Sequence, residues 1–568
     1  MKMNIKNTLL IVVTTLFLSS CIGDLNTIPI NDSDVTSETA YGKEELAYVQ
    51  GLTKIYAQFV TNDVTNLVVD DGGSSELIRT FWSTQEVTTD ACKAAWGNDS
   101  WCQDLNNNRW TAEQNHMIYS VYVRTLQGIT FANEYLRQTS EDKLSLRGVD
   151  ETLAAKIAGF RAEARFLRAY FYWMAFDSFG NVPFSTEDSQ FGGGYNPPQT
   201  ERKEVFEFVV SELEELVADG SAMPAAQSNY PRADKGSCLG LLARLYLNAE
   251  VYTKTDKEQG TPMWEEAKAT CEKIYGLGYS ICPDYAALFR GDNGENAQAK
   301  NEFLFAAAYH NQKTHSYGGT SFLTLASTQS SDVNNQPFYL NGVNGGWAGI
   351  RVPFNYVQKY FDVKNQDYTF DPGNALSTQD NLTRDLGYDV VDNRGKLFYI
   401  YNRQENMDDL YSYTHGWSCF KFNNVPHDKS GDEFAETAST TTFSDIDFPL
   451  IRLGEIHLIY AEACMHLGQQ NAALPKIAEL AERAGITAVS SIDQDWLVAE
   501  RARELMWEGH RRTDLIRYGL FSSDSFLWPY KGGSPQGQGF DSYRNIFAIP
   551  EVEMSSNLDL VQNPGYAD

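Results

Sequence analysis

Three stretches of the chain place a large aromatic side chain among glycine, asparagine and aspartate residues. They carry Trp96, Tyr317 and Trp347. A flat ring of this kind stacks on the apolar C–H face of a pyranose, while amide, carboxylate or guanidinium groups beside it bond the hydroxyls. Taken singly, each ring is more often a core residue, but text rich in Gly, Asn and Asp favours exposed backbone. The three stretches therefore predict a surface that binds sugar rings.

Residues in patterns typical of catalysis are sparse. The eight histidines are scattered, and the sequence has no HExxH motif, no nucleophile elbow and no glycine-rich phosphate loop. The paired carboxylates of a glycoside hydrolase cannot be singled out among 75 acidic residues. The net charge of −29 argues against nucleic acid as a partner, because phosphate binding depends on clustered Lys and Arg. The residues by themselves therefore leave a glycoside hydrolase open.

The longest helical pattern in the chain covers residues 157–184. Phe160, Ala164, Leu167 and Phe171 recur at steps of three and four residues, so they lie on one face of a helix. Gly180 is well placed to end that helix, since glycine commonly follows a helical C-terminus. The pattern predicts a central, nearly buried helix around which the rest of the chain is organised.

Further helices are predicted on both sides of this segment. They cover residues 44–59, 114–137, 204–218, 234–251, 264–275, 449–467, 471–483 and 496–518, with a shorter one over 352–361. Pairs of such helices are typical of tetratricopeptide-like packing, although no strict 34-residue period is visible. Residues 281–445 and the polar stretch 61–110 are predicted as loops, because Gly, Asn, Asp and Ser interrupt short β-branched runs.

The predicted fold is therefore mainly α. Residues 41–568 form a single domain, in which a helical scaffold covers 41–280 and 446–520. An irregular, loop-rich α+β subdomain covers 281–445, and we expect it to carry the ligand site together with the loops of 61–110.

The first residues have the features of an export signal. Lys2 and Lys6 precede an apolar run over 9–18, and the sequence Leu-Ser-Ser-Cys ending at Cys21 matches a bacterial lipobox. We predict a signal peptide over 1–20, a lipid on Cys21 and a polar tether over 21–40. An ordinary cleaved signal with a chance cysteine is the alternative. No later segment is long and apolar enough to span a bilayer, so the lipid would be the only membrane anchor.

Seven cysteines follow Cys21, and none is spaced like a zinc site. The pairs Cys92/Cys102 and Cys271/Cys282 are close enough in sequence to bridge in an exported protein. The odd number leaves the pairing open.

Two long segments give the sequence a family resemblance. RAEARFLRAYFYWMAFDSFGNVPF at 161–184 and NIFAIPEVEMSSNLDLVQNPGY at 545–566 resemble the SusD/RagB family of outer-membrane nutrient-binding lipoproteins. The resemblance implies a SusD-like fold with four tetratricopeptide-like helix pairs. It also implies a non-catalytic, lipid-anchored protein on the cell surface, which passes its ligand to a SusC-like TonB-dependent transporter.

Within that family, the loops resemble those of a starch-binding member. A TD-x-C-x-x-x-W motif ends at Trp96, a Tyr-Gly-Gly turn begins at Tyr317, and Asn-Gly-Gly-Trp ends at Trp347. These positions match an arc of three aromatic rings that suits the helical curve of an α-1,4-glucan. The polar residues that flank the arc are matched by Asp71, Arg79, Asp99 and Asn98. The resemblance implies that starch or malto-oligosaccharides are bound without cleavage.

An acidic turn resembles a loop of the same family that implies calcium. It contains Asp292, Glu295 and Asn296, and Asp445 or Asp447 would complete the ligand set. The turn lacks the spacing of an EF-hand loop, so a solvated turn is the alternative interpretation. We expect no required cofactor.

Three other interpretations of the whole chain stay open. The nearest is a member of the same family that binds a different glycan, because the loops of such a scaffold vary. The others are a lipid-anchored glycoside hydrolase and a helical scaffold that binds only protein.

Overall fold

The computed structural model describes residues 40–566, apart from 64–72, 114, 191, 193, 256, 331–340, 362–390, 401–402 and 430. The predicted signal peptide, Cys21, the tether up to residue 39 and Asp71 therefore lie outside the described residues.

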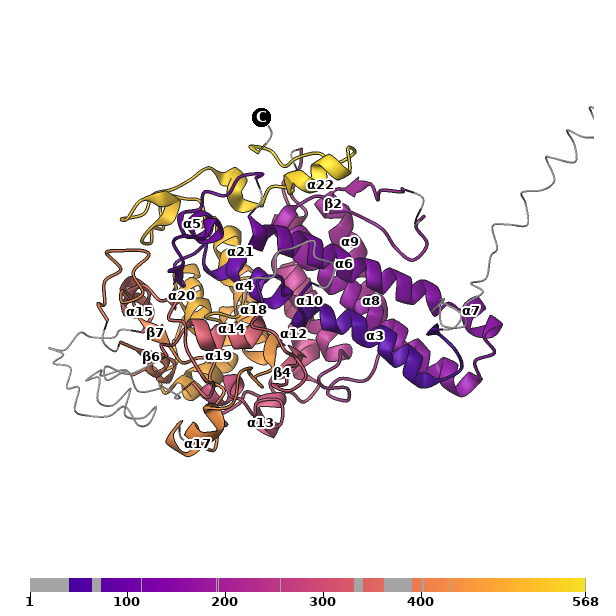
Figure 1. Cartoon of the computed structure of the whole chain (residues 1–568), viewed down its shortest axis with the longest axis horizontal. Helices are drawn as coiled ribbons and strands as arrows, with labels where there is room; N and C mark the ends of the chain where they lie inside the picture. Colours follow the sequence, from indigo (N-terminus) through magenta and orange to yellow (C-terminus); the bar gives the residue numbers. More distant parts are fainter. Residues whose placement is uncertain are drawn as a thin grey trace, which may run out of the picture.

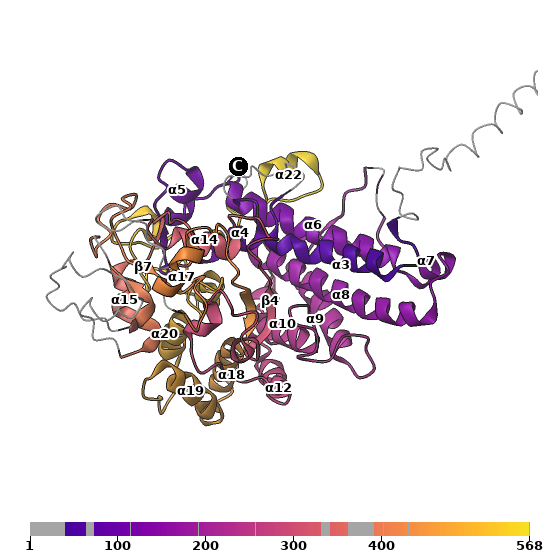
Figure 2. The same cartoon turned by 60° about the horizontal axis from the view of Figure 1, so that its bottom comes forward.

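A continuous series of packed helices forms the scaffold. α6 packs on α3 and α8, α8 on α9, α9 on α10, α10 on α12, α12 on α18, and α18 on α19. Figure 1 shows α3, α6 and α8 side by side in one half of the molecule and α15, α19 and α20 in the other, and Figure 2 shows the same division. The longer helices of this series are α3 (Glu45–Val60), α6 (His116–Gln138), α8 (Glu151–Phe179), α9 (Arg202–Val217), α10 (Lys235–Leu247), α12 (Trp264–Tyr275), α18 (Leu453–His466) and α19 (Gln470–Ala484).

The predicted central helix is confirmed as α8. The Asp150 carboxylate caps it by accepting a hydrogen bond from the Leu153 amide at 2.8 Å, and Gly180 ends it with a φ of +71°. Every residue from Phe166 to Phe179 is buried. Such complete burial is expected of a helix that is packed on several sides.

The region outside this series of helices has mostly short elements and long connections. Its strands form two-stranded antiparallel pairs: β1 (Lys93–Ala94) with β5 (Ile350–Arg351), β4 (Phe303–Ala307) with β8 (Phe448–Arg452), and β6 (Phe398–Tyr399) with β7 (Ser418–Cys419). A further pair joins β2 (Val182–Pro183) to β3 (Gln199–Thr200) beside the scaffold. Further helices in the described part of the chain are α7 (Glu141–Leu146), α11 (Ala249–Tyr252), η1 (Ala286–Phe289), α13 (Ala297–Lys300), α14 (Gly319–Ala326), α15 (Phe354–Phe361), η2 (Asn393–Leu397), α17 (Gly431–Ala438), η3 (Lys531–Gly533), η4 (Ser542–Asn545) and α22 (Glu551–Ser556).

The interpretation of 61–110 as loops is wrong for two segments. α4 (Leu77–Glu86) is a helix in which all ten residues are buried, and α5 (Ser100–Asn107) follows it. The polar residues of α4 hide its helical pattern, but they are buried because distant partners satisfy them. Glu86, for example, accepts hydrogen bonds from the amides of Gly509 and His510.

Two predicted helices near the C-terminus are divided by the structure. Residues 448–452 are strand β8 and not the start of α18, because they pair with β4. The helix predicted over 496–518 is two helices, α20 (Gln494–Glu504) and α21 (Arg511–Arg517). Positive φ angles of +62° at Trp507 and +81° at Gly509 separate them, since no helix continues through such residues.

A buried network of ion pairs joins the helical scaffold to the loop-rich half. Arg452, at the start of α18, contacts Glu302 at 2.9 Å, Glu504 at 2.5 Å and Glu508 at 2.6 Å. The further members are Arg483, which pairs with Glu302 and Glu504, Arg394, which pairs with Asp392, Glu500 and Glu504, and Lys421, which pairs with Glu508. Burial opposes the ionisation of Glu504, but the three arginines outweigh it and hold the pKa of Glu504 well below its usual range.

The seven cysteines from Cys92 to Cys464 are all buried free thiols, so neither Cys92/Cys102 nor Cys271/Cys282 is bridged. Over the described residues, no helix has the length and apolarity that crossing a membrane requires.

Candidate functional site

Two of the three predicted aromatic residues, Trp96 and Trp347, pack against one buried ring, Phe322. The ring centroid of Trp96 lies 6.1 Å from that of Phe322, and the centroid of Trp347 lies 6.2 Å from it. Tyr317 joins the group through Trp347, at a centroid distance of 5.8 Å. The chain thus brings together residues that are far apart in sequence into one aromatic cluster, which we call the aromatic arc (Trp96, Trp347 and Tyr317).

Two short elements position the arc. Pairing of β1 with β5 sets Lys93 opposite Arg351 and Ala94 opposite Ile350, so Trp96 and Trp347 are held at the same end of this small sheet. Helix α14 carries Phe322 and begins directly after the turn that holds Tyr317. The amide of Trp347 also donates to the carbonyl of Leu325 in α14 at 2.6 Å. The backbone therefore fixes all three rings relative to one another.

The arc rings are accessible, whereas the ring beneath them is not. Tyr317 is 40% exposed, Trp96 and Trp347 are half-buried, and Phe322 is fully buried. Rings that only fill a core would have no exposed face, so this arrangement fits a stacking surface better than a core cluster.

The predicted polar residues differ in their access to solvent. Asn98 is exposed and Asp99 half-buried, and the Asp99 amide donates to the carbonyl of Trp96 at 3.0 Å. Arg79 is only 7% exposed, and its guanidinium carbon lies 4.3 Å from the centroid of Phe322, a cation–π contact. Arg79 thus supports the floor of the arc, and Asp71 lies outside the described residues.

The buried carboxyl group of Glu76 holds the turn that carries Tyr317. It accepts hydrogen bonds from the hydroxyls of Tyr309 at 2.5 Å and Ser316 at 3.0 Å. A Cβ added at Gly318 would lie 1.8 Å from Glu76 Oε2, so only glycine allows the backbone to pass this close. Burial raises the pKa of Glu76 to about 8, despite the hydrogen bonds and the charge of Arg79.

The raised pKa of Glu76 predicts a pH-dependent stability. Between its ordinary value of 4.5 and about 8, the folded chain keeps a proton that the unfolded chain has released, so stability falls as pH rises through this window. The difference between these two pKa values corresponds to at most about 5 kcal/mol in the free energy of unfolding. Glu76→Gln cannot ionise, so its free energy of unfolding should increasingly exceed that of the wild type from pH 5 to pH 8. Urea unfolding at several pH values measures this.

Glu113→Gln is the control for the Glu76 prediction, because Glu113 is exposed. Its stability should follow the wild type at every pH. If the Glu76→Gln and wild-type curves run parallel from pH 5 to pH 8, Glu76 is ionised in the folded protein and the prediction is wrong.

Sequence reasoning missed three residues of this region. Phe322 stands in the same YGGTSFL segment as Tyr317, but no sequence pattern indicates that its ring supports the arc. Phe443 lies 5.0 Å from Tyr317 and His315 lies 5.3 Å from Phe443, both measured between ring centroids. Phe443 comes from the irregular segment before β8, and no local pattern in that segment indicates its contact with Tyr317.

The acidic turn with Asp292, Glu295 and Asn296 is separated in sequence from the three residues of the arc. The Asn296 side chain caps α13 by accepting from the amides of Gln298 and Ala299, and the Asp445 carboxylate accepts from the amide and side chain of Asn311. Asp292 accepts from the His427 amide at 2.8 Å. In the part of the chain that the structure describes, no three His, Cys, Asp or Glu side chains are grouped to hold a metal ion. The calcium ion stays a prediction.

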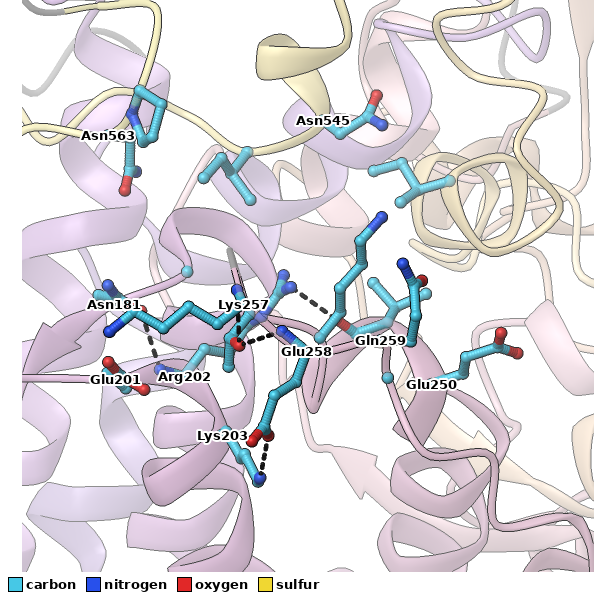
Figure 3. A pocket seen from close by; sticks show the side chains of 18 of the residues that line it. Asn181, Glu201, Arg202, Lys203, Glu250, Lys257, Glu258, Gln259, Asn545 and Asn563 are labelled. Atoms are coloured by element: carbon cyan, nitrogen blue, oxygen red, sulfur yellow. Dashed lines mark hydrogen bonds and ion pairs between the residues drawn. The ribbon is translucent and has the colours of Figure 1, made fainter.

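A large cavity of about 1060 Å³ lies on the helical scaffold (Figure 3). Its walls are the first turn of α9, the loop 254–260 and the segment 542–546. Some of the charged side chains that line it already have partners. Lys203 pairs with Glu258 at 3.0 Å, and Arg202 donates a hydrogen bond to the Val251 carbonyl at 2.6 Å. Tyr543 is the single aromatic residue among those that line it, so this cavity lacks a stacking surface like the arc.

Comparison with known proteins assigns the chain to a family. Residues 301–566 match the model of the SusD family, and residues 45–247 match a family described as starch-binding and associating with the outer membrane. The chain is 31% identical to the starch-binding protein SusD of Bacteroides thetaiotaomicron, over 98% of both chains.

Solved structures share the fold at lower identity. A SusD-like carbohydrate-binding protein from Bacteroides fragilis superposes with a TM-score of 0.66 at 19% identity, covering 92% of this chain and 100% of that one. A laminarin-binding SusD-like protein superposes with a TM-score of 0.62 at 20% identity, covering 93% of this chain and 100% of the other. These likenesses confirm the mainly helical SusD-like fold. Together with the family models and the identity to SusD, they lead to one conclusion: this chain is a member of the SusD family of glycan-binding proteins.

Proposed function

We propose that the protein captures starch, an α-1,4-glucan, and its malto-oligosaccharides without cleaving them. The observation that carries this proposal is the aromatic arc, in which Trp96, Trp347 and Tyr317 present partly exposed rings around the buried Phe322. Successive pyranose rings of a glucan can stack on such faces.

The polar residues beside the arc would bond sugar hydroxyls. Asn98 and Asp99 suit this role because they lie two and three residues after Trp96 and are accessible. Arg79 and Asp71 complete the proposed flank. The 31% identity to a protein named as starch-binding supports the choice of ligand.

A different glycan is the nearest alternative. The laminarin-binding protein has this fold, so the fold alone does not select the sugar. Native gel electrophoresis of the full-length protein distinguishes starch from a different glycan as the ligand. One gel contains amylopectin, and a gel that contains laminarin is the control. We expect retardation by amylopectin alone, whereas retardation by laminarin alone would replace starch as the ligand.

The absence of cleavage is tested in the same preparation. The relatives are named as binding proteins, which supports a binding role. Incubation with amylopectin should therefore release no reducing ends above the buffer control. Steady release that scales with protein concentration would favour the lipid-anchored glycoside hydrolase. Failure to bind any glycan would favour the scaffold that binds only protein.

We further propose that the protein is lipidated on Cys21, faces the cell surface at the outer membrane and delivers its ligand to a SusC-like TonB-dependent transporter. A family model described as associating with the outer membrane supports this location. Labelled palmitate should enter the wild-type chain in a bacterial host and be lost in Cys21→Ser. Equal labelling of the two chains would contradict lipidation at this residue.

The acidic turn with Asp292, Glu295, Asn296 and Asp445 is proposed to bind Ca²⁺ as a structural ion. Burial, together with the charges of Asp445 and Glu295, raises the pKa of the neighbouring Asp447 to about 6, and a cation would relieve this crowding. Saturating Ca²⁺ should raise the Tm by about 2 °C or more relative to EDTA, and Asp445→Asn should abolish the rise. Equal Tm values with Ca²⁺ and EDTA would exclude this ion.

A further inference from the structure

The aromatic series does not end at Tyr317. Tyr317 lies between Trp347, at a centroid distance of 5.8 Å, and Phe443, at 5.0 Å. His315 then stacks on Phe443, with centroids 5.3 Å apart and ring planes inclined by only 20°. The rings of Trp347, Tyr317, Phe443 and His315 therefore follow one another in an unbroken series.

Both additional rings are at the surface. Phe443 is half-buried, and His315 is exposed. An offset stack of this kind uses one face of His315 and leaves the other face to solvent. Imidazole supplies a flat face together with ring nitrogens that bond hydroxyls, a combination that suits a sugar.

The backbone holds the two rings in place before any ligand binds. Beside Phe443, the amide of Ser444 donates to Ser321 Oγ of α14 at 2.9 Å, and the amide of Asp445 donates to Asn424 Oδ1 at 2.7 Å. Beside His315, the hydroxyl of Ser316 donates to the buried Glu76. Because the same helix, α14, anchors Phe443 and follows Tyr317, the pair and the arc form one rigid surface. Rigid contacts lose little entropy on binding.

We propose that Phe443 and His315 form an additional sugar subsite at the Tyr317 end of the arc. The ligand is a further pyranose unit of the same glucan, stacked on the outer face of His315, with Phe443 supporting that ring. This inference rests on the proposed function of the arc. It implies that the pair sets a preference for longer chains, because a short oligosaccharide can occupy the arc alone.

The test compares the binding of a short and a long glucan. It uses the full-length protein, purified in a detergent without a sugar head group, because a maltoside would compete with the glucan for the site. Titration calorimetry with maltotriose and maltoheptaose is carried out on the wild type, Phe443→Ala and His315→Ala. We expect each variant to lose about 3- to 10-fold in affinity for maltoheptaose and less than about twofold for maltotriose. Phe443→Trp, which keeps a ring, should retain the wild-type preference.

Phe131→Ala is the matched control, because Phe131 is a half-buried phenylalanine on the scaffold helix α6, and it should leave both affinities unchanged. Equal loss for both oligosaccharides in Phe443→Ala would mean that Phe443 only holds Tyr317, and would overturn the subsite. Unchanged affinities would overturn it as well. Failure of the wild type itself to bind any α-glucan would instead refute the proposed function, and this result is visible without a variant.

Discussion

Replacing Trp347 with alanine is expected to weaken the binding of maltoheptaose by at least about tenfold. Trp347 lies in the middle of the arc, with Tyr317 on one side and the supporting Phe322 on the other. Its loss would remove one tryptophan ring and leave a gap between Trp96 and Tyr317. Titration calorimetry of the full chain measures the change in Kd, and the far-UV circular dichroism should stay that of the wild type.

The matched control for this prediction is Trp264→Ala. Trp264 is also half-buried, but it stacks on His466 at 4.0 Å on the helical scaffold. Its removal should leave maltoheptaose affinity within about twofold of the wild type, because it has no part in the arc. If Trp347→Ala binds as tightly as this control, the arc does not hold the sugar.

The second large effect is expected on stability. Arg452→Met should lower the free energy of unfolding by about 3–5 kcal/mol, because it takes one cationic partner away from each of three buried carboxylates. Arg452 is 1% exposed and contacts Glu302, Glu504 and Glu508. Methionine has a similar length and no charge, so the change tests the ion pairs more than the packing. Urea unfolding followed by circular dichroism gives the measurement.

The balance of charges explains why the arginine should matter more than a single carboxylate. The members of the buried network defined above are three arginines and one lysine against five acidic residues, so removal of Arg452 increases an existing excess of negative charge. Glu504→Gln removes one negative charge instead, and each arginine keeps another acidic partner. We therefore expect Glu504→Gln to cost less than Arg452→Met.

An exposed ion pair serves as the control for the stability effect of Arg452→Met. Lys156 and Glu45 contact each other at 2.5 Å, but their side chains are about half exposed. Lys156→Met should cost no more than about 1 kcal/mol. If Arg452→Met costs no more than Lys156→Met, the network contributes little to joining the two halves.

The scaffold helices could be predicted from sequence because their signals are local. α12 (Trp264–Tyr275) has the predicted bounds, and α8 was marked by its periodic apolar residues and its final glycine. α4 was missed because its polar residues are satisfied by partners far away in sequence, such as Asp177, which accepts from Gln85 at 3.0 Å. Likewise the prediction of a helix over the residues of β8 is wrong, because the pairing of β8 with β4 is not visible in a local pattern.

For the candidate site too, the individual residues could be predicted from local sequence, whereas their arrangement in space could not. Trp96, Tyr317 and Trp347 could be chosen from their local text and from the family resemblance. Their convergence could not be worked out from the residues, because it depends on the pairing of β1 with β5 and on the burial of Phe322. The contact of Phe443 with Tyr317 joins two irregular segments, whose geometry has no periodic signal in the sequence.

The most direct test of the central claim is titration calorimetry of the wild-type full chain with maltoheptaose, with a β-glucan oligosaccharide of similar length as the control. We predict saturable heat with maltoheptaose and none with the β-glucan. No heat with maltoheptaose, or equal affinity for the two sugars, would contradict selective capture of starch by the aromatic arc.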